Sequence, residues 1–160
     1  MSERETLTPH SHDQVKVVFP LEEGPAVAEA LWADPLGERQ YRLNNIPHFA
    51  YGINLGDEFL ARTVEGGPRP HFEQTLTFSG NQTVRITLAE NRSDDTGKTL
   101  HDMFEVMRHI STGYETYGPD YHVFNVPRGK LTGAVEALLD KGEDEMIWSW
   151  ELSTPDDADG

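Results

Sequence analysis

The chain has 160 residues and a mass of 18.0 kDa, the size of one domain or of two small subdomains that share a core. Its 13 basic and 28 acidic residues give a formal net charge of −15, and such a surface repels both the phosphate backbone of nucleic acids and anionic membranes. The absence of cysteine excludes disulfides, thiol nucleophiles, iron–sulfur clusters and cysteine zinc sites, and no apolar run approaches the roughly 20 residues of a membrane-spanning helix.

Polar segments are expected at both ends of the chain. Residues 1–13 lack the apolar core of a secretory signal, so they predict a disordered tail on a cytoplasmic protein. Residues 154–160 predict a second, acidic tail. Between the tails, residues 14–153 are expected to form a single α+β domain, mainly β over 14–95 and alternating between helix and strand over 96–153.

The first half of the chain shows short apolar segments separated by turn residues, which is the pattern of strands. The expected strands are Val15–Phe19, Ala30–Pro35, Gln40–Leu43, Glu58–Val64, Phe72–Phe78 and Thr83–Leu88. The last two flank Ser79-Gly80-Asn81-Gln82, and because Gly-Asn at a turn centre accepts positive φ angles, this pattern predicts a β-hairpin. We expect this half to form a curled antiparallel sheet or a small barrel.

From residue 96 onward the apolar residues recur with a helical period. This spacing predicts a helix over Leu100–Ile110, for which Thr99 and Asp102 resemble a capping box. A strand is expected over Tyr121–Val126, then a helix over Leu131–Leu138 that stops at Gly142, then a strand over Ile147–Leu152. Together with Thr83–Leu88, these elements predict a ferredoxin-like βαβαβ half with both helices on one face of the sheet.

Three stretches, in this order and spacing, resemble a known family. Residues 41–62 contain an Asn-Ile-Pro turn and a Gly-Asp before a strand, and residues 79–86 contain Ser-Gly-x-x-Thr-Val-Arg. Residues 124–152 contain a strand ending in Val-Pro, a helix that runs to Leu-Leu-Asp-Lys-Gly-Glu, and a final Trp-x-Trp-Glu-Leu. Over residues 15–152 the chain resembles DUF4265, a family of uncharacterised bacterial proteins, which implies a bacterial origin and this layout but no particular activity. The chain departs from the family pattern at Asn81, where a histidine is usual, and at Asn125, where an aspartate is usual.

Motifs for metal or cofactor chemistry are weak in this sequence. His10, His12 and Asp13 lie in the expected tail, and the helical stripe His101, Glu105 and His109 is more typical of a solvated helix face than of a metal site. The sequence has no His-Glu-x-x-His motif, no Gly-x-Ser-x-Gly nucleophile turn and no glycine-rich phosphate loop before a helix. We therefore expect no metal and no cofactor.

Polar side chains of the kinds that bind or protonate ligands gather in two segments. In Asn44–Arg62 and the neighbouring strand we assign His48, Tyr51 and Asp57 as candidate catalytic residues and Asn45, Arg62 and Arg85 as candidate substrate-binding residues. Arg85 could hold an anionic group or form an ion pair with Asp57, and the ion pair is favoured. Tyr114, Glu115 and His122 are further candidates for substrate binding. The competing interpretations are a structural turn for the first segment and a packed loop for the second.

Two functions of different classes fit these features. The first, which we favour, is a cofactor-free protein of bacterial small-molecule or specialised metabolism, acting on a polar and optionally anionic substrate as an acid–base enzyme or as a companion subunit. The alternative is an acidic protein-binding module of the immunity or antitoxin type, because an acidic surface speeds association with a basic partner. The expected partner is thus a small polar molecule or a protein, in a homo- or hetero-oligomer, and is neither nucleic acid nor membrane.

Overall fold

The computed structural model describes residues 13–21 and 27–154. Residues 1–12 and 155–160, which hold most of the two expected tails, lie outside this part. The described chain is an α+β protein, as expected, and it forms two compact units. The barrel unit comprises residues 13–21, 27–45 and 56–79, and the sheet unit comprises residues 46–55 and 80–154.

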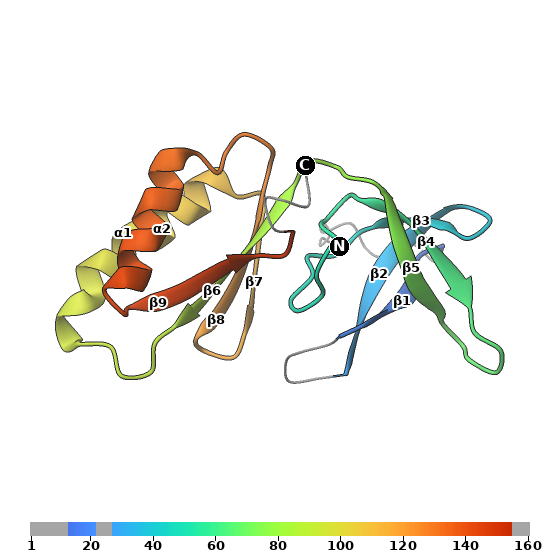
Figure 1. Cartoon of the computed structure of the whole chain (residues 1–160), viewed down its shortest axis with the longest axis horizontal. Coiled ribbons are helices and arrows are strands. Elements are labelled where there is room, and N and C mark those ends of the chain that lie inside the picture. Colours follow the sequence, from blue (N-terminus) through green and yellow to red (C-terminus); the bar gives the residue numbers. More distant parts are fainter. Residues whose placement is uncertain (1–12, 22–26, 155–160) are drawn as a thin grey trace, which may run out of the picture. The chain divides into compact units, whose positions relative to one another are not determined.

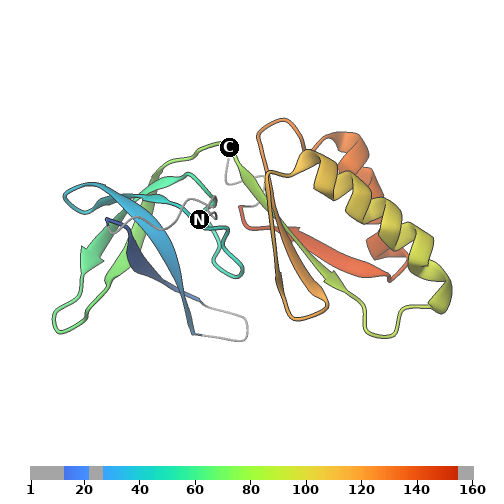
Figure 2. The ribbon, with the colours of Figure 1, turned by 180° about the vertical axis from the view of Figure 1, so that it is seen from behind.

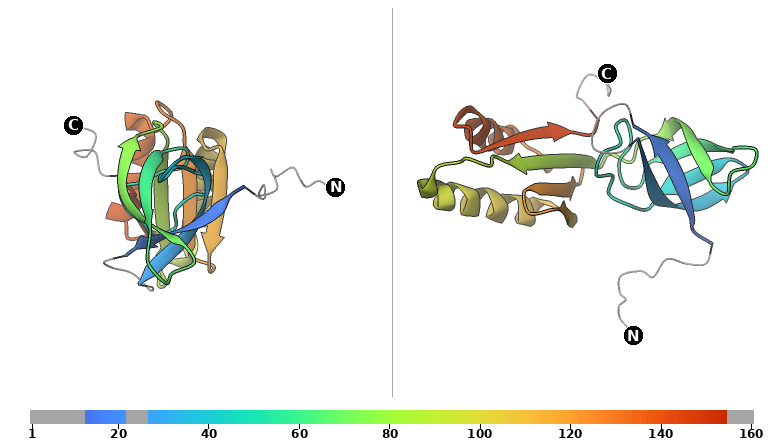
Figure 3. Two further views of the ribbon diagram at one scale, coloured as in Figure 1. Left: turned by 90° about the vertical axis from the view of Figure 1, so that its right-hand side faces the viewer. Right: turned by 90° about the horizontal axis from the view of Figure 1, so that it is seen from below.

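The barrel unit confirms the small barrel expected for the first half. Its strands are β1 (Val15–Pro20), β2 (Ala28–Gly37), β3 (Gln40–Leu43), β4 (Glu58–Thr63) and β5 (Pro70–Thr77), each antiparallel to the next. β5 pairs with β1 in parallel and closes the barrel, whose strands are strongly twisted (Figures 1 and 3). Alternate side chains point inward and form an apolar core of Val17, Phe19, Leu31, Ala33, Leu43, Phe59 and Ala61.

The sheet unit has the ferredoxin-like arrangement, with one strand more than expected. Its elements are β6 (Gln82–Leu88), a 3₁₀ turn η1 (Asp94–Thr96), α1 (Gly97–Ile110), β7 (Gly113–Tyr117), β8 (Tyr121–Val126), α2 (Gly133–Asp144) and β9 (Trp148–Leu152). The strand order is β7-β8-β6-β9, all neighbours antiparallel. Both helices cover the same face of this sheet (Figures 1 and 2). Between helices and sheet lies an apolar core built around Val84, Ile86, Met103, Met107, Phe124, Leu139 and Trp148.

The predicted hairpin at residues 79–82 is wrong. β5 belongs to the barrel and β6 pairs with β8 and β9, so Ser79-Gly80-Asn81-Gln82 is the place where the chain passes from one unit to the other. The turn signal itself was real, because Gly80 has a φ of +97°. A turn residue sets the local backbone, but it does not determine which strands pair on either side of it.

The structure also corrects three local predictions. Gly113–Tyr117 is an edge strand, β7, and not a packed loop; its side chains are mostly exposed, so its sequence shows no apolar alternation. Thr99 lies inside α1 rather than at its cap, and the N-cap residue is Thr96. α2 does not stop at Gly142; it continues to Asp144, and Met146 follows with a φ of +62° in the position that glycine usually occupies after a helix.

Gly142 has a packing role in place of the expected helix stop. A Cβ atom on this residue would lie 2.0 Å from Cζ2 of Trp148, which is far inside van der Waals contact. The buried Trp148 also donates its indole N–H to the Leu139 carbonyl, 2.9 Å away. Glycine at this position therefore lets β9 seat a large ring directly on α2.

Candidate functional site

The face of the sheet opposite the helices carries the polar side chains of β6. We call it the open face; on β6 it presents Thr83, Arg85 and Thr87, while Val84 and Ile86 point to the helices. Residues 46–55, which come between β3 and β4 in the sequence, belong to the sheet unit and contact this face. We call them the covering segment.

Arg85 is the centre of the contacts between the covering segment and the open face. Its side chain is only 1% exposed, so a charge at this position requires close partners. Nη2 donates to the carbonyl oxygens of Pro47, at 3.1 Å, and of Ala50. Nη1 donates to the Phe49 carbonyl and to Glu151 Oε2, both at 3.3 Å. The guanidinium thus ties three carbonyls of the covering segment to β6.

Tyr51 and Glu151 complete this arrangement on the β9 side. The hydroxyl of Tyr51 donates to the Glu151 carboxylate, with distances of 2.6 and 2.7 Å to its two oxygens. The Tyr51 ring lies 5.0 Å from the guanidinium carbon of Arg85, a cation–π distance. Arg85 therefore forms the expected ion pair, but its partner is Glu151 and not Asp57.

A second polar contact joins the covering segment to β7. His48 Nε2 lies 2.7 Å from Glu115 Oε1, and the histidine is 20% exposed. Aromatic rings surround this pair: Phe49 stacks on Tyr121, with centroids 5.5 Å apart, and meets Tyr117 edge-on. A histidine hydrogen-bonded to a carboxylate is an arrangement that general acid–base catalysis uses.

The far end of the covering segment is anchored by a buried polar network. Asn54 accepts from the Thr83 hydroxyl at 2.7 Å and donates to the Thr154 hydroxyl at 2.7 Å. The Gly52 amide donates to the Ser153 carbonyl. These bonds hold the segment at its C-terminal end as Arg85 holds it in the middle, so the open face has a fixed geometry.

A cavity of about 300 Å³ opens beside Arg85, at the lower end of the size range for small-molecule sites. It is lined by Arg85 and Thr87 of β6, Tyr121 of β8, Glu143 of α2, and Ser149, Trp150 and Glu151 of β9. Another hollow, of about 380 Å³, lies at the start of α1, but its charged side chains Glu90, Arg92 and Asp94 are not buried. Of these two, the cavity beside Arg85 contains a buried charge, and Arg85 is a residue that the sequence predicted for the site.

Two buried polar atoms on the open face lack a hydrogen-bond partner among the described residues. They are Nε of Arg85 and Oδ1 of Asn125, which lie on the adjacent strands β6 and β8. Asn125 uses its amide nitrogen to donate to the Thr112 hydroxyl at 2.9 Å. Unsatisfied buried atoms are uncommon in folded proteins, and functional sites are one of the places where they occur.

Three predicted site residues lie in the barrel unit. Asp57 is fully buried, and its Oδ1 accepts from the Ser79 amide at 2.7 Å. Asn45 accepts from the Trp32 amide at 2.6 Å, and Arg62 lies on β4 in register with His71. His48, Tyr51, Arg85 and Glu115 lie together in the sheet unit, so the predicted site divides between the two units.

Tyr114 and His122 lie on the helix side of the sheet, not on the open face. The Tyr114 ring stacks on Phe124, and its hydroxyl lies 2.8 Å from His122 Nδ1. Phe104 of α1 meets the His122 ring edge-on. Burial lowers the pKa of His122 below its ordinary value, while the Pro119 carbonyl and Asp120 act in the opposite direction. These two residues belong to the packing between β7, β8 and α1.

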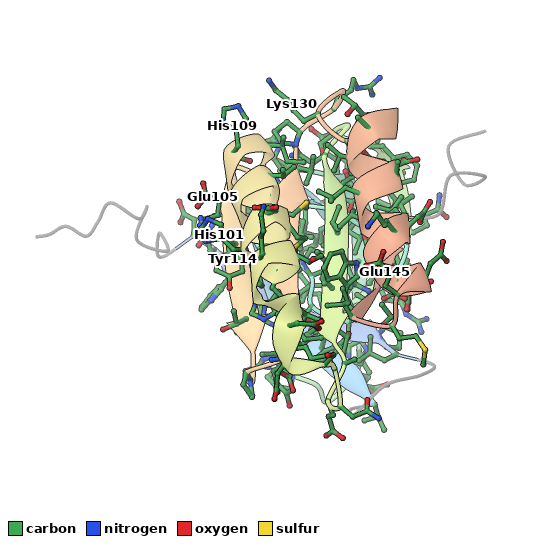
Figure 4. The ribbon with its side chains drawn as sticks, turned by 90° about the vertical axis from the view of Figure 1, so that its left-hand side faces the viewer. His101, Glu105, His109, Tyr114, Lys130 and Glu145 are labelled. Carbon is green, nitrogen blue, oxygen red and sulfur yellow. The ribbon has the colours of Figure 1, made fainter. Side chains whose placement is uncertain are left out.

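The histidine stripe of α1 follows one side of the helix, turned away from α2 (Figure 4). His101, Glu105 and His109 are exposed, and Glu105 forms an ion pair with Arg108. In the part of the chain that the structure describes, no group of histidine and acidic side chains is arranged to hold a metal ion.

Sequence reasoning missed most of the cavity wall. Thr87, Glu143, Ser149, Trp150 and Glu151 all line the cavity and were not proposed as site residues. Alternation along Trp148–Leu152 places Ser149 and Glu151 opposite the tryptophans, which is a signal that the sequence contains. It becomes informative only once β9 is known to pair with β6, where Arg85 faces Glu151.

Fold and site define an α+β protein in which a five-stranded barrel precedes a ferredoxin-like unit with a polar cavity. The chain belongs to the family described as a domain of unknown function, DUF4265, whose model matches residues 29–150. A hypothetical protein from Neisseria gonorrhoeae has a similar crystal structure, with a TM-score of 0.71 and 20% sequence identity over 89% of this chain and 94% of that chain. This likeness shows a common fold.

No curated protein matches the chain. Within the described residues, neither helix combines the length and the apolar character that crossing a membrane requires.

Proposed function

We propose that the chain is a cofactor-free protein of small-molecule metabolism that binds a polar ligand on the open face of the sheet unit. The observation that carries this proposal is the cavity of about 300 Å³ beside Arg85, lined by Thr87, Tyr121, Glu143, Ser149, Trp150 and Glu151. The lining is mostly polar, which suits a polar ligand. The bonds of Arg85 and Asn54 keep these groups in place before a ligand arrives.

The same face offers a group for proton transfer. His48 and Glu115 form a hydrogen-bonded pair, and Tyr121, which lines the cavity, donates its hydroxyl to the His48 carbonyl. An enzyme built on this face would use His48 as the proton carrier and Glu115 to orient its ring. A companion subunit would bind the ligand without this step.

Blocking the cavity tests the binding proposal. A panel of polar metabolites is screened by thermal shift and NMR against wild type, Ser149→Trp and Thr77→Trp. Ser149 is exposed and lines the cavity, whereas Thr77 is an exposed strand residue of the barrel unit. We expect a ligand that binds wild type and Thr77→Trp but not Ser149→Trp. Equal binding to Ser149→Trp would place the site elsewhere.

The catalytic role is tested on the ligand that the screen identifies. In D₂O, acid–base chemistry would exchange a carbon-bound hydrogen of the ligand for deuterium, which mass spectrometry detects. We expect exchange with wild type and at least about a hundredfold less with His48→Gln, the usual minimum for loss of a general acid–base group. Binding without exchange in wild type would identify a companion or carrier protein.

An acidic protein-binding module remains the second candidate. The end of α2 presents three exposed acids, Glu143, Asp144 and Glu145, next to Met146, which is 77% exposed. Calorimetry between this chain and the basic product of a neighbouring gene tests it. Binding that is weakened by Asp144→Asn and Met146→Ser, while Ser149→Trp has no effect, would favour this function over the cavity.

A further inference from the structure

Strand β7 forms one edge of the four-stranded sheet. In the described part of the chain it pairs only with β8, so the backbone N–H and C=O groups on its outer side have no strand beside them. The side chains of residues 114–117 are exposed, and Tyr114 and Tyr117 are 45% and 55% exposed. An edge strand of this kind can take up a further strand.

β7 lacks the features that usually protect an edge strand from such pairing. It contains no proline and no lysine, and it pairs with β8 without a register shift. Its tyrosines and threonine favour extended backbone. The opposite edge, β9, is protected by α2, because Glu143 Oε1 accepts the backbone N–H of Trp150 at 2.9 Å. Of the two edges, β7 is therefore the one open to a partner.

Side-chain contacts on both faces hold β7 in place. On the helix side, the Tyr114 ring stacks on Phe124, with centroids 4.8 Å apart, and its hydroxyl lies 2.8 Å from His122 Nδ1. On the open face, Glu115 is hydrogen-bonded to His48 of the covering segment. A strand that is already ordered costs less entropy when a partner binds to it.

The charges at this edge favour a basic partner. β7 carries one charged residue, Glu115, whose side chain is 44% exposed, and the partly exposed Asp120 follows in the turn to β8. Glu105 and Arg108 of α1 form an ion pair and add no net charge. Glu115 and Tyr117 share the open face, so a basic side chain of an added strand can bond to the carboxylate and lie against the ring.

A second copy of the chain suits this edge less well. Each copy carries a net charge of −15, so two copies repel each other. Antiparallel pairing about the central residue of β7 would also set Glu115 opposite Glu115, and like charges in directly opposed positions are destabilising.

We propose that the outer edge of β7 binds an extended segment of a basic partner protein, which adds to the sheet as a further strand and places an arginine or lysine against Glu115 and Tyr117. Main-chain hydrogen bonds to β7 supply affinity, and the residues that alternate with the basic ones contact the Tyr114 ring on the helix side. No residue of β7 lines the cavity beside Arg85, so this surface is distinct from the proposed ligand site and does not rest on it.

The test uses the full chain labelled with ¹⁵N and the peptide acetyl-Arg-Val-Arg-Val-Arg-Val-Arg-amide. Two isomers of this peptide carry N-methyl groups, one on the valines and the other on the arginines. Both keep the charge, but each lacks the hydrogen-bond donors along one edge of the extended peptide. A peptide with glutamine in place of arginine is the neutral control. In the protein, Glu115→Gln removes the charge of β7, and Glu90→Gln removes an exposed charge elsewhere in the sheet unit.

The arginine peptide should shift the amide resonances of residues 114–117 in a saturable way. At least one N-methylated isomer should bind about tenfold more weakly, because it loses several strand hydrogen bonds. Glu115→Gln should weaken binding about two- to fivefold, and Glu90→Gln should leave it unchanged. Ser149→Trp, which fills the cavity, should bind the peptide as wild type does.

Equal binding of the arginine peptide and both N-methylated isomers would show that charge alone attracts it, and would overturn the proposal. Shifts confined to the acidic end of α2, or no shift at β7 with any peptide, would also overturn it. Equal binding of the glutamine peptide would refute a basic partner. Shifts at β7 that depend on protein concentration without peptide, together with a dimer in sedimentation, would assign the edge to a second copy instead.

Discussion

Arg85 shows how one buried charge can organise a segment that is distant in sequence. Its guanidinium binds three carbonyls of residues 47–50 and pairs with Glu151, 66 residues further on. Such a group is costly to desolvate, so its net contribution to stability is modest, but removing it leaves its partners buried and unpaired. Arg85 determines the position of the covering segment more than it adds to the free energy of folding.

We expect Arg85→Met to lower the free energy of unfolding by about 3–5 kcal/mol, the usual loss when one partner of a buried ion pair is removed. The matched control is Arg108→Met, which breaks an exposed ion pair on α1 and should cost less than about 0.5 kcal/mol. Both values come from denaturant titration. A loss below about 1 kcal/mol for Arg85→Met would show that the three carbonyls find other partners.

His122 should make stability depend on pH. Because burial lowers its pKa in the folded state, the unfolded chain binds this proton first as the pH falls. Stability is therefore complete above the ordinary histidine pKa of about 6.5 and decreases below it. His122→Phe keeps an aromatic ring beside Phe104 and Tyr114 but cannot be protonated.

The free energy of unfolding of wild type should fall between about pH 7.5 and about pH 5.5, and His122→Phe should lose less over the same interval. Denaturant titration at both pH values measures this difference. His109→Phe on the exposed side of α1 is the control and should keep the wild-type slope. Identical slopes for His122→Phe and wild type would mean that His122 is protonated equally well in both states.

Among the elements, helix α2 is one whose end could not be predicted from residue type alone. Gly142 is the kind of residue that ends helices, and no other glycine lies between Gly133 and β9. The helix nevertheless passes through Gly142, where Trp148 fills the space that a Cβ atom would occupy. Met146 ends the helix instead: its amide bonds to the Glu143 carbonyl, and that of Ile147 to the Gly142 carbonyl. Gly142 therefore serves the packing of Trp148, and the helix ends two residues later, at Asp144.

Gly142→Ala should therefore destabilise the protein, although alanine is normally the better helix residue by about 0.5–1 kcal/mol. We expect a loss of about 1–3 kcal/mol, as in overpacked cores. Gly133→Ala is the control, because a Cβ atom at the first residue of α2 would meet nothing within 4 Å. Thermal or denaturant unfolding measures the change in stability of both variants. Gly142→Ala should be less stable than wild type, and Gly133→Ala should be equally or more stable. A Gly142→Ala protein more stable than wild type would refute the packing role.

For the whole molecule, the features that the sequence could predict are those that depend on residues close together in the chain. Strands and helices with clear apolar periods were predicted close to their observed bounds, because that period depends on neighbouring residues only. The prediction of a hairpin at residues 79–82 was wrong because the pairing of strands depends on residues far apart in the chain. Strand β7 was not predicted because an exposed edge strand has no apolar pattern.

The residues of the candidate site could likewise be predicted only in part. His48 and Arg85 were chosen for their chemistry, and they do lie in one unit, whereas Asp57, nine residues from His48, lies in the other. Glu151 could not be chosen, because its place opposite Arg85 depends on the pairing of β6 with β9. Chemistry can be predicted residue by residue, but the partners of a residue depend on the topology.

The assignment of the covering segment to the sheet unit predicts how its amides exchange with solvent. The Gly52 amide bonds to Ser153 of the sheet unit, while the amides of Leu43 and Ala61, on either side in sequence, bond within the barrel unit. Compact units whose contacts are mostly internal often unfold separately. In Gly142→Ala, which weakens the core of the sheet unit, hydrogen exchange should accelerate at Gly52 and at Leu88 of β6. Leu43 and Ala61 should keep their wild-type rates. Faster exchange at all four amides would mean that the two units unfold together, so that the covering segment opens at the same time as the barrel residues on either side of it in sequence.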